Sequence, residues 1–361
     1  MKLKDMYNEQ YIADLTAAVL SEFPAFDGSS FAARVFGDGW QERELKDRMR
    51  HITIVLHDLL PSDYRAALGI LRRSTVNLSQ YGFENMVFCE FVGVYGLDDW
   101  EASIPALEAF TQLISAEFAV RPFIQQDRDR MMAQMLAWAQ HDSAEVRRLA
   151  SEGCRPRLPW GIALPTLKAD PSPILPVLEH LKLDESEAVR RSVANNLNDI
   201  SKDNPEVVIT VLQCWQALGR EEIDRITGHA LRGLLKAGNP AALELLGYPP
   251  DPAIAVRNLK AEPETIPFGG EVIVSFDIES LGDRPQNLMI DYVVHYMKAS
   301  GELRPKVWKL SKRTIQPGET VQISKRHSFQ AVTTRKHYPG AHAVEPKING
   351  RLFGRVMFTV D

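Results

Sequence analysis

The spacing of apolar residues changes from three and four to two near residue 250, and this change constrains the fold more than any other feature. Before it, segments such as 104–118 and 128–140 repeat apolar residues at the period of a helix. The segment YPPDPA at 248–253 ends the pattern, because closely spaced prolines cannot continue a helix. The sequence therefore predicts a helical domain over 1–248 and an all-β domain over 255–361.

Short alternating runs separated by turn signals fill the predicted β domain. In the segment GEVIVSFDIES, apolar residues at 272, 274, 276 and 278 point to one face of a strand. The dipeptides Pro317-Gly318, Pro339-Gly340 and Asn349-Gly350 are turn signals between such runs. Several short strands in a segment of this length are typical of an immunoglobulin-like sandwich.

The helical part contains an internal repeat. The segments VRRLASEGCRP, VRRSVANNLND and IDRITGHALRG begin at residues 146, 189 and 223, so their spacings are 43 and 34 residues. Spacings of this size are found in HEAT-type repeats, in which each helix pair buries its apolar face against the next pair. The predicted fold is an α-solenoid of HEAT-like helical repeats followed by the immunoglobulin-like sandwich.

Aligning the repeats places polar residues at equivalent positions. Offsets of zero, four and seven residues lie within about 60° of one another on a helix, so each helix carries one polar stripe. The three stripes are Arg148, Glu152 and Arg155; Arg191, Asn195 and Asn198; and Arg225, His229 and Arg232. Arginines repeated along a solenoid groove suit a phosphate backbone. Ordinary solvated helix faces explain the stripes equally well.

The distribution of charge is uneven along the chain. The formal net charge is −5, yet residues 298–355 contain 13 Lys or Arg and three acids. A basic face on an otherwise acidic protein is typical of phosphate binding. A solvated basic sheet face is the alternative interpretation.

The motifs of metal and nucleotide sites are missing. The chain has no CxxC, HExxH, P-loop or GxSxG pattern, so we expect no metal and no cofactor, and we expect His337 and His342 on the surface. With no apolar run of about 18 residues and a polar N-terminus, neither a membrane span nor a signal peptide is expected. Three separated cysteines suit a reducing cytoplasm.

One loop combines an acid, arginines and an aromatic residue. In SEGCRPRLPWG, Glu152 stands near Arg155 and Arg157. Two prolines before Trp160 restrict the loop that carries it. One repeat earlier, SAEFAVRPF places Glu117 before an Arg-Pro pair. Acids on such faces can be simple helical ion pairs, and a tryptophan can be core or lid.

These segments, together with VRRSVANNLNDISKDNP, resemble the AlkC group of the AlkD-like DNA glycosylases. The basic stretch from Trp308 onward is similar to the immunoglobulin-like domain of that group. The resemblance covers nearly the whole chain. It implies a cofactor-free monofunctional enzyme that excises cationic N3-methylated bases, 3-methyladenine and also 3-methylcytosine, from alkylated double-stranded DNA. It also implies excision without full base flipping.

The residues can be assigned roles on this basis. A cationic base leaves without a general acid, so a carboxylate near the sugar stabilises the oxocarbenium-like transition state. We expect Glu152 in that role, Glu117 as a second or water-orienting acid, and Trp160 against the cationic lesion. Asp199 and Asp203 are lesser acid candidates, for which helix capping is the ordinary explanation. The predicted DNA-binding residues are Arg148, Arg155, Arg157, Arg191, Asn195, Lys202, Lys312, Arg313, Lys325, Arg326, Arg335 and Lys336.

Two other functions fit the same pattern. One is a non-catalytic repeat protein that binds distorted or damaged DNA, and the other is a scaffold for a protein partner. A scaffold would favour exposed apolar grooves, whereas the stripes are polar and cationic. Since a solenoid that wraps DNA needs no second subunit, we expect a monomer.

Overall fold

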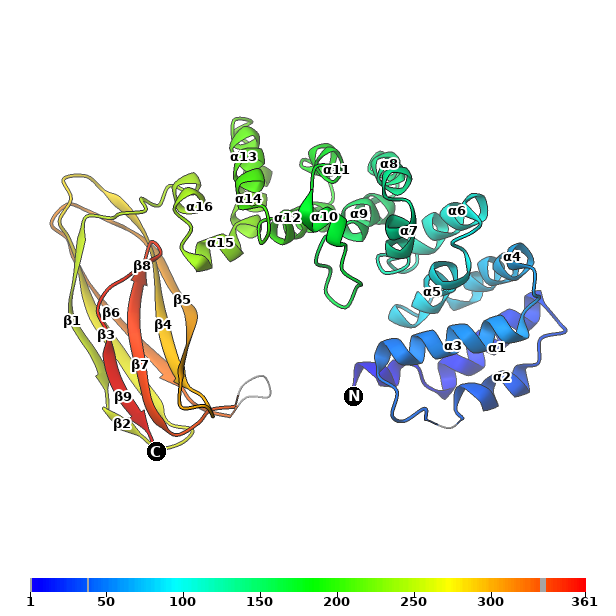
Figure 1. Ribbon diagram of the computed structural model, residues 1–361, viewed down its shortest axis with the longest axis horizontal. Coiled ribbons are helices and arrows are strands. Elements are labelled where there is room, and N and C mark those ends of the chain that lie inside the picture. Colours follow the sequence, from blue (N-terminus) through cyan, green and yellow to red (C-terminus); the bar gives the residue numbers. More distant parts are fainter. Residues whose placement is uncertain (1, 38, 332–335) are drawn as a thin grey trace. The chain divides into compact units, whose positions relative to one another are not determined.

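The computed structural model describes residues 2–37, 39–331 and 336–361. The chain divides into two compact units, the first formed by 1–204 and 218–230 and the second by 205–217 and 231–361. Helices fill the chain up to residue 245, and strands follow from residue 254, as Figure 1 shows along the colour gradient. Among the described helices, none is long and apolar enough to cross a membrane.

The first unit is a series of short helices in which each packs against its neighbours. They are α1 (Glu9–Glu22), α2 (Gly28–Val35), α3 (Leu45–Leu59), α4 (Tyr64–Ser74), α5 (Met86–Tyr95), α6 (Trp100–Thr111), α7 (Val120–Gln126), α8 (Arg128–Trp138), α9 (Ala144–Gly153), α10 (Pro165–Ala169), α11 (Leu175–Leu181), α12 (Glu187–Ile200) and α14 (Glu221–Ala230). Helix α12 packs against both α9 and α14. The predicted helical-repeat architecture is confirmed.

The three predicted repeat helices correspond to α9, α12 and α14. Their buried residues recur at three- and four-residue spacing, as in Val189, Val193 and Leu197 of α12. The third stripe was predicted too long, because α14 ends at Ala230 and Arg232 begins another helix. The prediction for Asn198 was also wrong. Its side chain is buried and donates a hydrogen bond to the carbonyl of Ala230.

Within its described residues, the second unit contains three helices and the strands. The helices are α13 (Pro205–Gln216), α15 (Arg232–Ala237) and α16 (Pro240–Leu245); the strands are β1 (Ile254–Glu262), β2 (Thr265–Ile266), β3 (Glu271–Ser280), β4 (Gln286–Met297), β5 (Leu303–Ile315), β6 (Thr320–Ser328), β7 (Gly340–Ile348), β8 (Arg351–Leu352) and β9 (Val356–Val360). One sheet has the order β1-β3-β6, and the other has the order β2-β9-β7-β4-β5, with β8 beside β7. Neighbouring strands are antiparallel except β2 and β9.

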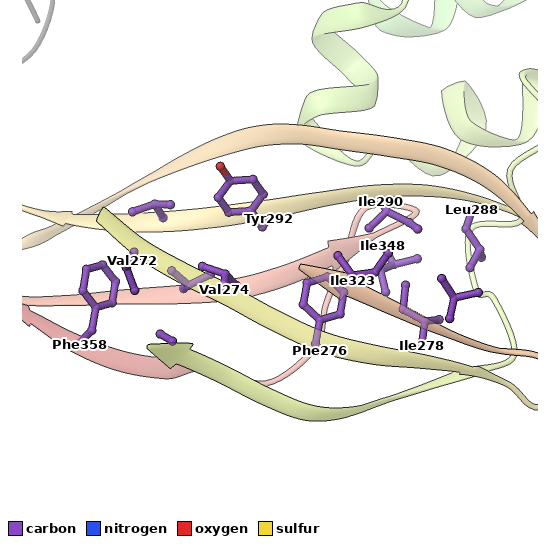
Figure 2. Packing of buried hydrophobic residues seen from close by; sticks show 14 of the residues in the cluster. Val272, Val274, Phe276, Ile278, Leu288, Ile290, Tyr292, Ile323, Ile348 and Phe358 are labelled. Carbon is purple, nitrogen blue, oxygen red and sulfur yellow. The ribbon is translucent and has the colours of Figure 1, made fainter. Parts of the chain in front are cut away.

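The two sheets enclose one apolar core, which confirms the predicted sandwich. Val272, Val274 and Phe276 of β3 point into it, whereas Ile273 between them is 42% exposed. Figure 2 shows Phe276 of β3 beside Ile348 of β7, with Ile290 of β4 close to Ile348. The period of two in the sequence is thus the inside–outside alternation of a sandwich strand.

The hairpin between β7 and β8 packs closely against the helices of its own unit. Asn349 and Gly350 have φ values of 45° and 84°, as a two-residue hairpin turn requires. A Cβ atom added to Gly350 would lie 2.7 Å from Gly238 Cα, so the two backbones touch. The Asn349 amide donates to the Pro249 carbonyl, and Lys347 Nζ donates to the Lys236 carbonyl.

The expectation that His337 and His342 lie on the surface was wrong. Both are at most 5% exposed, and their rings pack against Phe329. Apolar neighbours distant in sequence cover them, which a loop-like local sequence does not reveal.

Candidate active site

Two adjacent helices of the first unit bring charged side chains together. Helix α9 presents Arg148 and Glu152 on one face, because residues four apart lie one turn from each other. Arg155 follows directly after α9. Helix α12 presents Ser192 and Asp199, two turns apart, toward the same place. Glu117 comes from the turn that precedes α7.

Five of these side chains, together with Lys202 just after α12, form a row of alternating charge, called here the charged row: Glu117, Arg148, Glu152, Arg155, Asp199 and Lys202. Arg148 Nη2 lies 3.0 Å from Glu117 Oε2 and 3.8 Å from Glu152 Oε1. Arg155 donates to Glu152 at 2.6 Å and to Asp199 at 2.9 Å. Lys202 Nζ lies 2.9 Å from the second oxygen of Asp199.

The middle of the charged row is buried, and its cations become more exposed toward the ends. The side chains of Glu152 and Asp199 are 7% and 2% exposed, whereas those of Arg148 and Lys202 are 33% and 48% exposed. Burial disfavours the charge on Arg155, but Glu152 and Asp199 outweigh it and raise the pKa of Arg155 above its ordinary value. The row therefore holds charges that would be costly if buried singly.

Two serines support the carboxylates. Ser192 Oγ donates to Glu152 Oε2 at 2.5 Å, so both oxygens of Glu152 have a fixed partner. Ser115 Oγ donates to Glu117 Oε2 at 2.9 Å and accepts from Arg148 Nη1 at 3.0 Å. Each acid is thereby held in one orientation, as a preorganised electrostatic site requires.

Trp160 lies on the loop that follows α9 and is 63% exposed. Its φ of 63° places it in the left-handed region, which residues with a Cβ rarely adopt. Ile162 beside it is 45% exposed. Core packing therefore does not account for this side chain or for its strained backbone.

The remaining predicted residues of the first unit have different surroundings. Arg157 makes two hydrogen bonds to Asp203, at 2.8 and 2.6 Å. Arg191 is exposed and forms no ion pair with the residues that the structure describes. It lines a cleft of about 150 Å³ between α12 and α14. Asn195 lies 2.8 Å from the ring of His229.

The structure separates the two lesser acid candidates. Asp199 belongs to the charged row, so the interpretation of it as a helix cap was wrong, whereas Asp203 pairs with Arg157 near the surface. Sequence reasoning missed Ser192 and Ser115. The seven-residue spacing from Ser192 to Asp199, which puts both on one helix face, was the available signal.

The predicted basic residues of the sandwich lie on strands β5 and β6 and near the start of β7. Those that the structure describes are exposed: Lys312, Arg313, Lys325, Arg326 and Lys336. Arg326 lies 3.3 Å from Glu271. Arg335 lies outside the described residues. Within the described parts of the chain, no group of three His, Cys, Asp or Glu side chains is placed to hold a metal ion.

These features define a helical-repeat protein that carries an immunoglobulin-like domain. A family model described as the C-terminal Ig-like domain of the uncharacterised protein YhaZ matches residues 255–361. The chain is 44% identical to the uncharacterised protein YhaZ of Bacillus subtilis, over 99% of both chains. It superposes on Pseudomonas fluorescens AlkC, an alkylpurine DNA glycosylase bound to DNA containing an abasic-site analogue. That match has a TM-score of 0.95 and 38% identity, with both chains fully covered. The chain belongs to the AlkC group.

Proposed function

We propose that the protein is a DNA glycosylase that releases cationic N3-methylated bases from alkylated double-stranded DNA by hydrolysis of the N-glycosidic bond. The observation that carries the proposal is the charged row, in a chain similar to AlkC over its full length. The substrates we propose are 3-methyladenine and 3-methylcytosine. Both carry a positive charge on the base, which makes the base a good leaving group.

The charge balance of the row supports this chemistry. Its three acids and three cations cancel as long as all six are in contact. Arg148 and Lys202 are the more exposed of its three cations, so they are the members that can turn toward phosphates. The remaining Glu117, Glu152, Arg155 and Asp199 would then carry a net charge of −2. Such a surplus stabilises a cationic base and the oxocarbenium-like sugar.

The individual roles follow from this arrangement. Glu152, the buried acid with both oxygens held, is proposed to face the developing cation. Glu117, which is 17% exposed, is proposed to orient the water. Trp160 is proposed to lie against the cationic lesion, where cation–π attraction adds about 0.5–2 kcal/mol. Arg148, Arg157, Arg191, Asn195 and Lys202 are proposed to bind the DNA backbone. Arg155, also predicted to bind DNA, is 7% exposed and donates to two acids, so we propose instead that it fixes those acids.

Two further parts of the proposal rest mainly on the resemblance to the AlkC group. The base is proposed to leave without rotating fully into a pocket, which the exposed position of Trp160 permits. The basic residues of the sandwich are proposed to contact the same duplex. Free cysteines at 89, 154 and 214 agree with action in a reducing compartment.

Release of free base tests the proposal. The purified full chain is incubated with N-methylated duplex DNA in EDTA without nucleotide, and released bases are separated and identified. We expect 3-methyladenine to be released under single-turnover conditions, with an amplitude set by the amount of that base in the DNA. Tight binding without release would instead make the protein a non-catalytic reader of damaged DNA, and the absence of both would favour a protein scaffold.

Arg148→Ala is expected to weaken binding to duplex DNA and to lower the slope of log K against log salt concentration by about one unit. The physical reason is the loss of one phosphate contact with its released counterion. Fluorescence anisotropy across a salt series measures the slope. Arg65→Ala is the control, since Arg65 also pairs with a carboxylate, Asp99, but outside the charged row. An unchanged slope would place Arg148 away from phosphate.

A further inference from the structure

The loop between α9 and α10 must be held in a conformation that it would not adopt alone. It runs through Pro156 and Pro159 and carries Trp160 in the left-handed region. A non-glycine residue persists there only when its surroundings fix the backbone. The contacts that fix this loop are therefore part of what shapes the site.

Arg121 of α7 supplies most of those contacts. Its side chain is fully buried, and its guanidinium donates to three backbone carbonyls: Gly153 and Arg155, both at 2.9 Å, and Ile162 at 2.6 Å. A Cβ atom on Gly161 would lie 3.1 Å from Arg121 Nε, so the loop closes tightly around the guanidinium. Although burial lowers the pKa of Arg121 to about 10, the group stays charged at neutral pH.

The three carbonyls lie next to, or belong to, three residues of the proposed site. Gly153 directly follows Glu152, Arg155 is the centre of the charged row, and Ile162 is two residues from Trp160. Arg121 itself is four residues from Glu117, in the segment that carries the second acid. One planar group with fixed donor directions thus ties together the backbones of four site residues.

From this geometry we propose that Arg121 is the positioning residue of the site, setting Trp160 and Glu152 at a fixed separation through the loop backbone. The inference rests on the proposed function. A second cation completes the arrangement: Lys46 of α3 donates to the Trp160 carbonyl at 2.8 Å, with its Nζ 4.7 Å from the centre of the Phe118 ring. Arg121 thereby holds the two ends of the loop, and Lys46 holds its tip.

Arg121→Lys in the full chain tests the proposal, because lysine keeps the charge but loses the planar fork. We expect single-turnover release of 3-methyladenine to slow about tenfold, since small misplacements of reacting groups have large kinetic effects. The Kd for methylated duplex should stay nearly unchanged. Limited trypsin digestion after Arg157 should become about tenfold faster, as the open form of the loop is populated more.

The matched control is Arg147→Lys. Arg147 is also buried and also donates to two backbone carbonyls, of His141 and Asp142, but it lies outside the charged row. This variant should keep wild-type base release and wild-type cleavage after Arg157. Equal losses in both variants would mean that Arg121 is merely structural, and wild-type behaviour of Arg121→Lys in both assays would also overturn the proposal.

Lys46→Met keeps the inference testable if Arg121→Lys does not fold. Methionine retains the contact with Phe118 but removes the donor to the Trp160 carbonyl. The same two changes are expected in a weaker form, and unaltered trypsin cleavage would contradict the proposal. Trypsin cleavage needs no glycosylase activity. A wild-type protein that released no base would therefore refute the proposed function while the positioning of the loop was still decided by digestion.

Discussion

Glu152→Gln is expected to slow base release by about 10³-fold, which is the scale found when a preorganised electrostatic group is removed from a transition state. The glutamine keeps the shape of Glu152: its amide oxygen can accept from Arg155, and its amide nitrogen can donate to Ser192 Oγ. It removes the negative charge that the proposed mechanism places beside the developing sugar cation. Binding to methylated DNA should change little, because Glu152 is buried, and Arg148, the proposed phosphate ligand 3.8 Å from it, keeps its closer contact with Glu117. Single-turnover rates and anisotropy titrations separate the two effects.

The matched control for Glu152→Gln is Glu90→Gln. Glu90 is 8% exposed and pairs with Arg50 at 2.5 Å, so it too is a buried carboxylate held by an arginine. Both variants lose one buried charge, but only Glu152 belongs to the charged row. Near-normal base release by Glu152→Gln would mean that the assigned role is wrong. A comparable loss in Glu90→Gln would point to a general effect of stability, which urea unfolding would reveal.

Asp199→Asn is expected to slow base release by about 10²-fold, through the loss of one negative charge from the row. Arg155 would still pair with Glu152. Because it would no longer pair with a charged Asp199, its positive charge would act on the Glu152 carboxylate alone. Asp203→Asn is the paired control. Asp203 lies four residues away and pairs with Arg157 near the surface, so its replacement should leave the chemical step close to wild type. Equal rates for the two variants would remove Asp199 from the proposed machinery.

The sequence predicted the features of this protein that depend on local period. The change of period near residue 250 gave the two fold types, and Arg148, Glu152 and Arg155 were grouped correctly because they lie within seven residues of one another. Contacts between helices could not be predicted from the sequence. Asp199 is 44 residues from Arg155, and which of its neighbours it meets depends on how α12 packs against α9. The contacts of Arg121 could not be predicted for the same reason. Its partners are backbone carbonyls, which leave no recognisable pattern of side chains in the sequence.

Two predictions made from local sequence patterns were wrong, because tertiary structure overrides those patterns. The stripes assumed helices that continue through their last polar residue, yet α14 ends at Ala230 before Arg232, and α9 ends at Gly153 before Arg155. His337 and His342 stand among polar and small residues, but the sandwich core covers them. The rings that pack against these histidines include Tyr296 and Phe358, which a window of neighbouring residues does not contain.

The contact between the β7–β8 hairpin and the last helices limits how the sandwich can be reused. A gene fusion that began at the first strand, β1, would transfer the sandwich without Lys236, Gly238 and Pro249, which the hairpin contacts. The Asn349 amide would then lose one of its two acceptors, the Lys347 ammonium would lose the Lys236 carbonyl, and the Gly350 backbone would face water. A graft onto another protein should therefore start upstream of α15, so that the sandwich keeps the helices that contact its β7–β8 hairpin.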